Sequence, residues 1–379
     1  MLKNKKDILK FAAIVILIIG IILVITLYIV NENFRKLVDK YVLAKEIVEE
    51  NVITIPLEES ANNYVYAVEN HIAILSGNIL KMYNASGKEV QSLNMNISKP
   101  IFEADNKYLV VAESGGKKLY LVSGNNILWE KDVEGSISKI NVNKNGYVSV
   151  VLTGTSYKVV VTTYNTEGKE LFSTYLSTTY SVDIDLSDDN KYLAIAEANS
   201  SGTVIKSGIK IISIEKAQTT PSEAIIYNNQ NMNNQIITKL SYQDNLVYMY
   251  ESGIGSIINE EINTLSEFQE DDLFADIDLT NNIVKVTKKE SNLFDMATTV
   301  EITNSSSKKT SVYTLDGVPK GIYTYGDIIA LNIGTEIHFV GTNGWLIKKY
   351  VSSQEIREVV LSSNIAGIVE RNKVEIISL

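Results

Sequence analysis

A unit of about forty residues recurs along most of the chain. It consists of a polar turn followed by a hydrophobic strand, and its clearest copies are residues 106–113 (NKYLVVAE) and 190–197 (NKYLAIAE). The third residue of the unit serves as an anchor, and eight anchors lie 36 to 54 residues apart: Ile72, Tyr108, Tyr147, Tyr192, Leu246, Ile283, Ile328 and Ile365. Units of this length, rich in strand-forming residues, are typical of the blades of a β-propeller.

Two further echoes keep the same register. Residues 83–89 (YNASGKE) return as residues 164–170 (YNTEGKE), and residues 183–188 (DIDLSD) return as residues 276–281 (DIDLTN). The glycine in the first pair supplies the positive φ that a tight hairpin demands. Each blade is therefore predicted to contain four strands joined by short turns, which in the third blade cover residues 137–143, 147–152, 158–164 and 170–176.

The number of strands predicts how the ring closes. The eighth unit has only three strands, the last at residues 374–378, while a spare strand at residues 52–55 precedes the first unit. An open edge would expose unpaired backbone groups, so residues 52–55 are expected to pair beside residues 374–378. The result is an all-β, eight-bladed propeller over residues 51–379. Seven blades remain an alternative, because the fifth and sixth units are the least regular and residues 291–309 contain a long polar break.

Residues 11–30 (FAAIVILIIGIILVITLYIV) contain no charged side chain. As a helix, twenty residues extend about 30 Å, the thickness of the hydrocarbon core of a bilayer. A buried core helix and a cleaved signal peptide are the competing interpretations, but the sequence after Leu27 lacks the small residues of a typical cleavage site. An uncleaved transmembrane signal anchor is the favoured interpretation.

The charges on either side of this segment bear on its orientation. Residues 1–10 carry four lysines, against Arg35, Lys36 and Lys40 in the ten residues after the segment. The positive-inside rule favours a cytoplasmic tail at residues 1–10 and an extracytoplasmic propeller. Apolar residues recur at helical spacing after the segment, so residues 31–50 are predicted to form a helical stalk. Alternatively, this amphipathic helix lies on the membrane or on the propeller.

Composition excludes several classes of function. The chain has no cysteine, which excludes disulfides, zinc–thiolate sites and cysteine nucleophiles. Residues 1–45 carry eight basic and three acidic side chains, a charge of +5, so the remainder accounts for −15 of the total of −10. A domain this acidic repels a phosphate backbone, which argues against nucleic-acid binding.

Two kinds of candidate residue for chemistry stand out. The two histidines, His71 and His338, are interpreted as strand residues rather than as bases or metal ligands. The repeated pairs Asp183/Asp185 and Asp276/Asp278 have the composition of a calcium site or of a hydrolase dyad, since alternate residues of a strand share a face. The favoured interpretation is that they are solvated or turn-capping residues at a repeated position.

Other polar motifs are interpreted as structural. Residues 188–190 form a turn signal, and Asp271 and Asp272 are placed in a loop. Gly253 and Gly255 are not followed by the third glycine of a nucleotide-binding fingerprint. No catalytic, cofactor-binding or metal-binding residue is assigned from the sequence, and no cofactor is expected.

Residues 120–130 (YLVSGNNILWE) resemble the quinoprotein-type propeller repeat, whose tryptophan docks between blades. Trp129 matches this tryptophan, Trp345 matches it loosely, and Phe172 occupies the place in the third blade. Residues 186–194 resemble the turn of TolB-like and WD40-like propellers, without its proline and glycine. The overall layout is similar to an uncharacterised family of membrane-anchored propellers from clostridia and their relatives, and this resemblance implies no activity.

These features predict a non-enzymatic scaffold that binds proteins or ligands at the cell envelope. Its expected partners are the lipid bilayer, through the N-terminal helix, and other envelope proteins. The alternative is an envelope enzyme, either a quinoprotein-like oxidoreductase or a carbohydrate-active hydrolase. An enzyme would need charged groups that converge at one mouth of the central channel.

Overall fold

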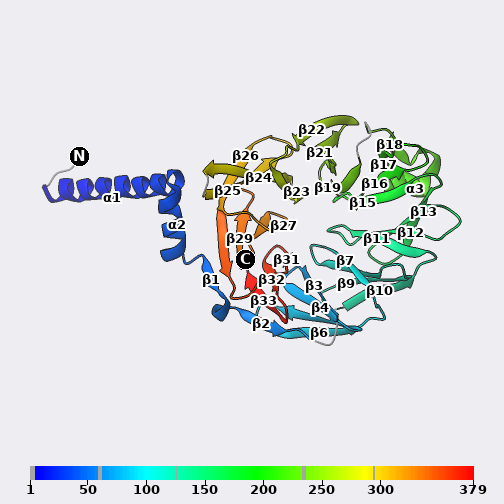
Figure 1. Ribbon diagram of the computed structural model, residues 1–379, viewed down its shortest axis with the longest axis horizontal. Coiled ribbons are helices and arrows are strands. Elements are labelled where there is room, and N and C mark those ends of the chain that lie inside the picture. Colours follow the sequence, from blue (N-terminus) through cyan, green and yellow to red (C-terminus); the bar gives the residue numbers. More distant parts are fainter. Residues whose placement is uncertain (1–4, 59–61, 125, 233–235, 293–294) are drawn as a thin grey trace.

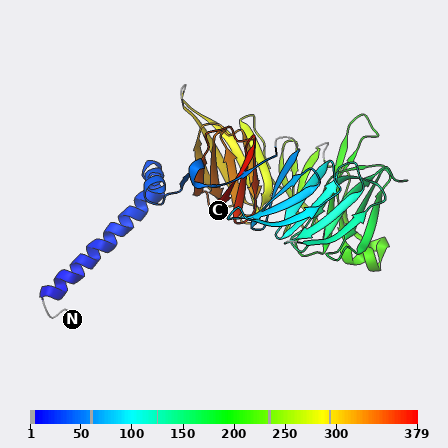
Figure 2. The ribbon, with the colours of Figure 1, turned by 90° about the horizontal axis from the view of Figure 1, so that it is seen from below.

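A computed structural model describes residues 5–58, 62–124, 126–232, 236–292 and 295–379. Two helices, α1 (Lys5–Val30) and α2 (Glu32–Tyr41), precede a ring of eight β-sheets in this part of the chain (Figure 1). The ring is a flat disc, and α1 leaves from its rim rather than from either flat face (Figure 2).

Each of the first four blades is an antiparallel sheet whose strands follow one another in sequence. Blade 1 contains β3 (Asn63–Val68), β4 (His71–Ser76), β5 (Ile79–Asn84) and β6 (Glu89–Asn94). Blade 2 contains β7 (Pro100–Asp105), β8 (Tyr108–Glu113), β9 (Lys118–Ser123) and β10 (Asn126–Asp132). Blade 3 contains β11 (Ser136–Val142), β12 (Val148–Thr153), β13 (Val159–Tyr164) and β14 (Glu170–Leu176). Blade 4 contains β15 (Tyr180–Leu186), β16 (Tyr192–Asn199), β17 (Lys206–Ser213) and β18 (Ile225–Asn229), with α3 (Ile214–Thr219) and a 3₁₀ turn (Pro221–Glu223) between the last two strands.

The remaining blades continue the ring, and two of them recruit strands from the N-terminal segment. Blade 5 contains β19 (Ile237–Tyr242), β20 (Leu246–Tyr250), β21 (Gly253–Ile258) and β22 (Glu261–Glu267). Blade 6 contains β23 (Asp272–Leu279), β24 (Asn282–Asn292), β25 (Asp295–Asn304) and β26 (Thr310–Asp316). Blade 7 contains β27 (Gly321–Tyr325), β28 (Ile328–Asn332), β29 (Glu336–Gly341), β30 (Leu346–Val351) and the added strand β1 (Glu46–Val48). Blade 8 contains β31 (Glu358–Leu361), β32 (Ile365–Val369), β33 (Lys373–Ser378) and β2 (Ile53–Pro56), with a 3₁₀ turn (Glu49–Asn51) between β1 and β2.

The repeat found in the sequence corresponds to the second strand of every blade. Seven of its eight anchors lie within that strand, and Tyr147 immediately precedes β12. The prediction of an eight-bladed propeller is confirmed, and the seven-bladed alternative is wrong. The polar residues 291–309 do not break the pattern, because β25 runs through them and pairs with β24 and β26. Residues 293–294 of that segment lie outside the described residues.

The ring closes between segments from the two ends of the propeller. Strand β2 pairs antiparallel with β33, with Thr54 opposite Glu375 and Ile55 opposite Val374 (Figure 1). The Ile55 side chain is 5% exposed, in the core shared by blades 8 and 1. Lys373 on β33 reinforces this closure through an ion pair with Glu49, and the Thr54 hydroxyl on β2 donates to Glu375 on β33 at 3.1 Å.

The segment before β2 differs from the helical stalk predicted to residue 50. The helix ends at Tyr41, where the N–H groups of Val42 and Leu43 both donate to the Val38 carbonyl oxygen at 2.9 Å. Ala44 then has a φ of 48°, which turns the chain towards the ring. Strand β1 follows and pairs in parallel with β30, whose outer edge would otherwise expose unpaired backbone groups.

Trp129 shows how neighbouring blades are joined. Its indole Nε1 donates to the carbonyl oxygen of Thr166, in the β13–β14 turn of the next blade, at 3.1 Å. The ring lies against Gly168, where an added Cβ would come within 2.8 Å of it, so the turn needs glycine for this contact as well as for its φ of 77°. This is the docking between blades that the resemblance to quinoprotein-type repeats implies.

Candidate functional site

The innermost strands of all eight blades line a central channel (Figure 1). It contains a cavity of about 630 Å³. Each innermost strand contributes side chains to its wall: Tyr66 (β3), Glu103 (β7), Asn141 (β11), Asp185 (β15), Ser241 (β19), Asp276 (β23), Tyr325 (β27) and Glu358 (β31). The wall is polar, in contrast to the aliphatic layers between the blades.

Acidic and basic residues alternate on five consecutive innermost strands, and we call them the charge ring: Glu103, Lys139, Asp183, Lys239 and Asp276. The Nζ atom of Lys139 lies 2.5 Å from Asp183 Oδ1. Lys239 Nζ lies 2.5 Å from both Asp276 Oδ1 and Asp278 Oδ2. Ion pairs along the channel wall therefore join blade 3 to blade 4 and blade 5 to blade 6, in addition to the apolar packing between blades.

The first aspartate pair fastens blade 4 to blade 5. Asp183 Oδ2 accepts a hydrogen bond from the backbone N–H of Leu240 at 2.7 Å, and Asp185 Oδ2 accepts one from Tyr242 at 2.6 Å. Both carboxylates point the same way because alternate residues of a strand share a face. Asp183 is 5% exposed, so the expectation of a solvated or turn-capping residue is wrong for it. Its position on an innermost strand explains the difference.

The second pair converges on one lysine. Asp276 and Asp278 both contact Lys239 from blade 5, and Asp276 Oδ2 also accepts a hydrogen bond from Thr324 of blade 7 at 2.8 Å. Burial disfavours the charge on Lys239, but the two carboxylates outweigh this and raise its pKa. The two aspartate pairs lie on separate blades, and each is engaged with its neighbours. Such pairs are poorly suited to flank a glycosidic bond as acid and nucleophile.

Burial shifts the pKa values of several carboxyl groups in the channel. It raises the pKa of Glu103 to about 8, assisted by the negative charge of Asp278, while Lys239 acts in the opposite direction. It raises the pKa of Asp105 to about 7, assisted by Asp188. The pKa of Asp278 is raised to about 6 by burial and by Asp276, although 45% of its side chain remains accessible within the channel. Near neutral pH the channel therefore contains both protonated and ionised carboxyl groups.

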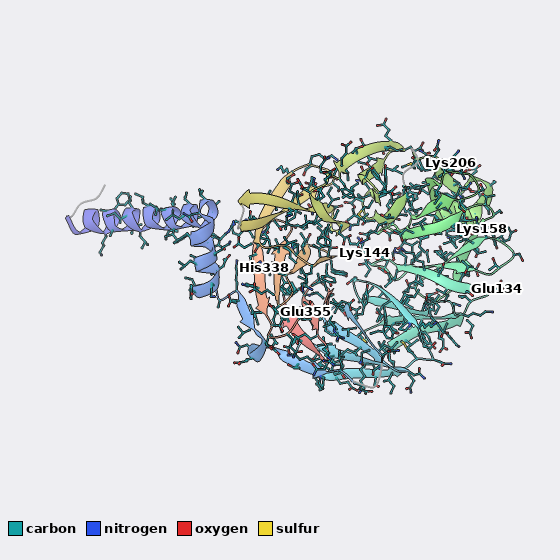
Figure 3. All side chains as sticks on the ribbon, in the orientation of Figure 1. Glu134, Lys144, Lys158, Lys206, His338 and Glu355 are labelled. Carbon is teal, nitrogen blue, oxygen red and sulfur yellow. The ribbon has the colours of Figure 1, made fainter. Side chains whose placement is uncertain are left out.

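The two histidines lie away from the channel. His338 is in β29 and its Nδ1 atom is 2.7 Å from the Tyr313 hydroxyl oxygen (Figure 3). Burial lowers the pKa of His338 to about 4, with a further contribution from Lys349, so the ring is neutral at physiological pH. His71 begins β4 in blade 1. The structure brings neither histidine to the aspartate pairs.

The other polar motifs have structural positions. Asp188 forms an ion pair with Lys144 across blades at 2.8 Å, and Asp189 accepts hydrogen bonds within its own turn. Asp272 begins strand β23 rather than lying in a loop, and it accepts a hydrogen bond from Thr287 at 2.6 Å. Gly253 and Gly255 lie in β21, where an added Cβ would collide with Tyr250 and Tyr248. Across the described residues, no group of three or more histidine, cysteine or acidic side chains is arranged to hold a metal ion.

A second polar cluster joins the apolar helix α1 to the ring, and we call it the junction. The Tyr28 hydroxyl donates to Asp39 Oδ1 at 2.6 Å, and Lys45 Nζ lies 2.9 Å from the same oxygen. Lys45 also donates to the carbonyl oxygen of Leu346 in blade 7 at 2.8 Å. The ring of Trp345 meets that of Tyr28 edge to face, with centroids 5.6 Å apart. Sequence reasoning missed the junction, because its residues come from three separate segments.

Similarity to solved structures extends over the whole ring. The C-terminal WD40 domain of Sif2 matches with a TM-score of 0.57 and 13% identity, over 86% of this chain and 97% of that domain. Sqt1 from Chaetomium thermophilum, solved with the N-terminus of ribosomal protein L10, matches with a TM-score of 0.52 and 10% identity, over 87% and 100% of the two chains. BamB from Moraxella catarrhalis matches with a TM-score of 0.50 and 11% identity, over 86% and 99%. At these identities the likeness shows the propeller fold alone.

Comparison at the level of sequence gives a family. No curated protein matches the chain. A family profile matches residues 45–379, which include every blade and both strands that the N-terminal segment adds to the ring. The chain belongs to DUF5711, a family of unknown function.

Proposed function

We propose that this protein is a single-pass, membrane-anchored scaffold that binds protein or ligand partners at the cell envelope, with its propeller on the extracytoplasmic side. The observation that carries the proposal is the apolar helix Lys10–Val30, which has a mean hydropathy of 3.3 and is not buried in the protein. A helix of this length and composition is stable in a bilayer. The layout of the whole chain, an apolar helix followed by a propeller, is similar to that of membrane-anchored propellers from clostridia and their relatives.

The contacts of the two aspartate pairs argue against the hydrolase alternative. Asp183 and Asp276 are engaged by lysines and by neighbouring strands, so neither carboxylate is free to attack or protonate a substrate. Rigid propellers present loops on both faces, and partner sites on other folds use such loops. Sqt1 provides an example of a similar fold with a protein segment bound.

Crosslinking in cells tests the scaffold. The full chain is crosslinked mildly and purified, beside a chain that lacks residues 52–55 and so cannot close its ring. We expect specific envelope proteins to be enriched with the full chain and lost with the open ring. If the full chain is folded yet enriches no partner, the scaffold is contradicted. Absorbance of a bound quinone and a screen of envelope glycans would then test the enzyme alternative.

Two matched substitutions locate the partner site within the same experiment. Lys144 lies near the centre of the ring, and Lys206 lies at its far rim (Figure 3). If the partner binds at the channel mouth, Lys144→Glu should reduce its recovery at least fivefold while Lys206→Glu leaves recovery unchanged. The reverse result would assign the partner to the rim.

A further inference from the structure

The short helix α2 follows the membrane segment so closely that its depth is constrained. It begins at Glu32, two residues after Val30 ends the apolar span. Asn31 caps it, accepting a hydrogen bond from the Phe34 N–H at 3.0 Å. If α1 crosses the bilayer, the lipid headgroups lie within one or two helical turns of α2. Figure 1 shows α2 turning steeply away from the axis of α1, and Figure 2 shows it nearly end-on.

One side of α2 is fixed to the propeller by polar contacts. Lys36 Nζ lies 2.5 Å from Asp316 Oδ2 at the end of β26. Asp39, one turn further on, is buried and is held by Tyr28 and Lys45 in the junction. Since residues three apart share a face of a helix, these two side chains define the face that looks toward the ring.

The opposite side of α2 and the residues that follow it are apolar and exposed. Leu37 and Tyr41, four residues apart on one face, are 56% and 74% exposed, and Val42 and Leu43 are 70% and 50% exposed. We call Leu37, Tyr41, Val42 and Leu43 the interfacial patch. Trp345, between β29 and β30 of blade 7, is 41% exposed and contacts Tyr28 near the end of α1. A cluster of large apolar side chains on a water-facing surface marks an interaction site.

We infer that the interfacial patch lies in the headgroup region of the bilayer, so that α2 is a second membrane contact that holds the rim of blades 6 and 7 against the membrane. The inference rests on the proposed membrane anchor. The occupant follows from continuity with α1, since the patch faces away from the ring at the level where the apolar span ends. Its chemistry also fits, because tryptophan and tyrosine favour the membrane–water interface and flanking lysine and arginine side chains favour anionic headgroups.

The absence of native cysteine makes a site-specific test direct. Single cysteines carrying nitroxide labels are placed at Tyr41 in the interfacial patch, at Ile18 in the middle of α1 and at Tyr175 on β14 in blade 3. The full chain is reconstituted in vesicles of phosphatidylcholine and phosphatidylglycerol. Power saturation then compares the access of oxygen, which concentrates in the bilayer, with that of a water-soluble nickel chelate.

The three labels test the headgroup contact of the interfacial patch separately from the membrane anchor on which it rests. We expect the label at residue 18 to report the bilayer core, the label at residue 41 to report headgroup depth and the label at residue 175 to report water. A label at residue 41 that behaves like the one at residue 175, while residue 18 reports the core, overturns the interfacial contact and leaves the anchor standing. A label at residue 41 shielded from both reagents overturns it in favour of a protein partner. A label at residue 18 in water contradicts the anchor itself.

The two tryptophans give an independent measurement on nearly native protein. Trp129→Phe leaves Trp345 as the reporter, and Trp345→Phe leaves Trp129, on blade 2, as the matched control. With brominated lipids we expect Trp345 to be quenched at least threefold more than Trp129. Leu37→Glu, which places a charge in the patch, should reduce the quenching of Trp345. Equal quenching of the two tryptophans would contradict the inference.

Discussion

The carboxyl group of Glu103 lies among charges of both signs on neighbouring innermost strands. Burial and the charge of Asp278 raise its pKa to about 8, against the partial compensation of Lys239. Among the described residues, no ion pair is formed by Glu103 itself, whereas Asp183 and Asp276 have lysine partners. Glu103 therefore holds a proton at neutral pH.

The raised pKa of Glu103 makes stability depend on pH. Between about pH 4.5 and pH 8 the folded protein keeps a proton that the unfolded chain has lost, so the free energy of unfolding falls as pH rises through this window. Glu103→Gln, which cannot ionise, should remove this decline. The free energy of unfolding of the variant, relative to that of the parent, should rise by roughly 3–5 kcal/mol between pH 4 and pH 9. Urea unfolding at pH 4, 6, 8 and 9 measures this.

Glu103→Asp provides the matched control, since it retains an ionisable group on the same strand. Its free energy of unfolding should still decline between pH 4 and pH 9. If the Gln variant declines as steeply as the parent, the channel does not hold a protonated Glu103.

At the scale of elements, ring closure depends on a strand of four residues. Strand β2 is antiparallel to β33 and buries Ile55 in the core between blades 8 and 1. Ile53 lies on the same face of the strand, two residues earlier, but at the start of the strand it is 37% exposed. The ion pair between Lys373 and Glu49 adds a polar fastening at the same seam.

The two isoleucines of β2 provide a matched pair of substitutions. Ile55→Ala removes buried methyl groups and leaves a cavity at the seam, which should lower the free energy of unfolding by about 2–4 kcal/mol. Ile53→Ala should lower it by about 1 kcal/mol or less, because its side chain is already partly in water. Thermal and urea unfolding compare the two. Equal effects would show that closure by β2 does not limit stability.

The ring was predictable from the sequence because its strands obey local rules. Strand β14 has the bounds that alternation and turn residues predict, and the β13–β14 turn contains the repeated Asn165 and Gly168. Strand β1 could not be predicted, because three residues carry too little pattern and its partner β30 is distant in sequence. Because β1 was not recognised, the helix was predicted to continue past Tyr41 to residue 50.

The charge ring could not be recognised in the sequence either, because the turns between the first and second strands of the blades differ in length. Glu103 precedes its anchor tyrosine by five residues, whereas Asp183 precedes its own by nine. Aligning the repeats by their anchors therefore does not align these residues, and only the Asp183 and Asp276 echo was recognisable. To predict that these acidic residues converge on lysines, one must know which strands are innermost and which blades are neighbours.

At the scale of the whole molecule, attachment through the rim determines which surfaces are free. The segment that follows the apolar helix meets the disc at blades 6 and 7, through Lys36 and Lys45, and neither flat face is covered by α1 (Figure 2). Blade 3 lies across the ring from blade 7 (Figure 1). Both mouths of the channel are thus left uncovered by α1.

The side of the membrane on which the disc lies can be determined in intact cells. We expect a single cysteine at Tyr175, which is 56% exposed, to react with a membrane-impermeant maleimide added from outside. A cysteine in place of Lys3, in the basic tail, should react only after the cells are lysed. The opposite pattern of labelling would place the propeller in the cytoplasm and contradict the orientation that the lysines favour.

The pairing of β2 with β33 also sets an order of events during synthesis. Strand β2 leaves the ribosome soon after the apolar helix, but its partner is made only after residues 57–372 have been added. Throughout that interval the early strand has an open edge, and contacts so far apart in sequence form slowly. Closure of the disc is therefore a late event in folding, since it needs the last strand of the ring.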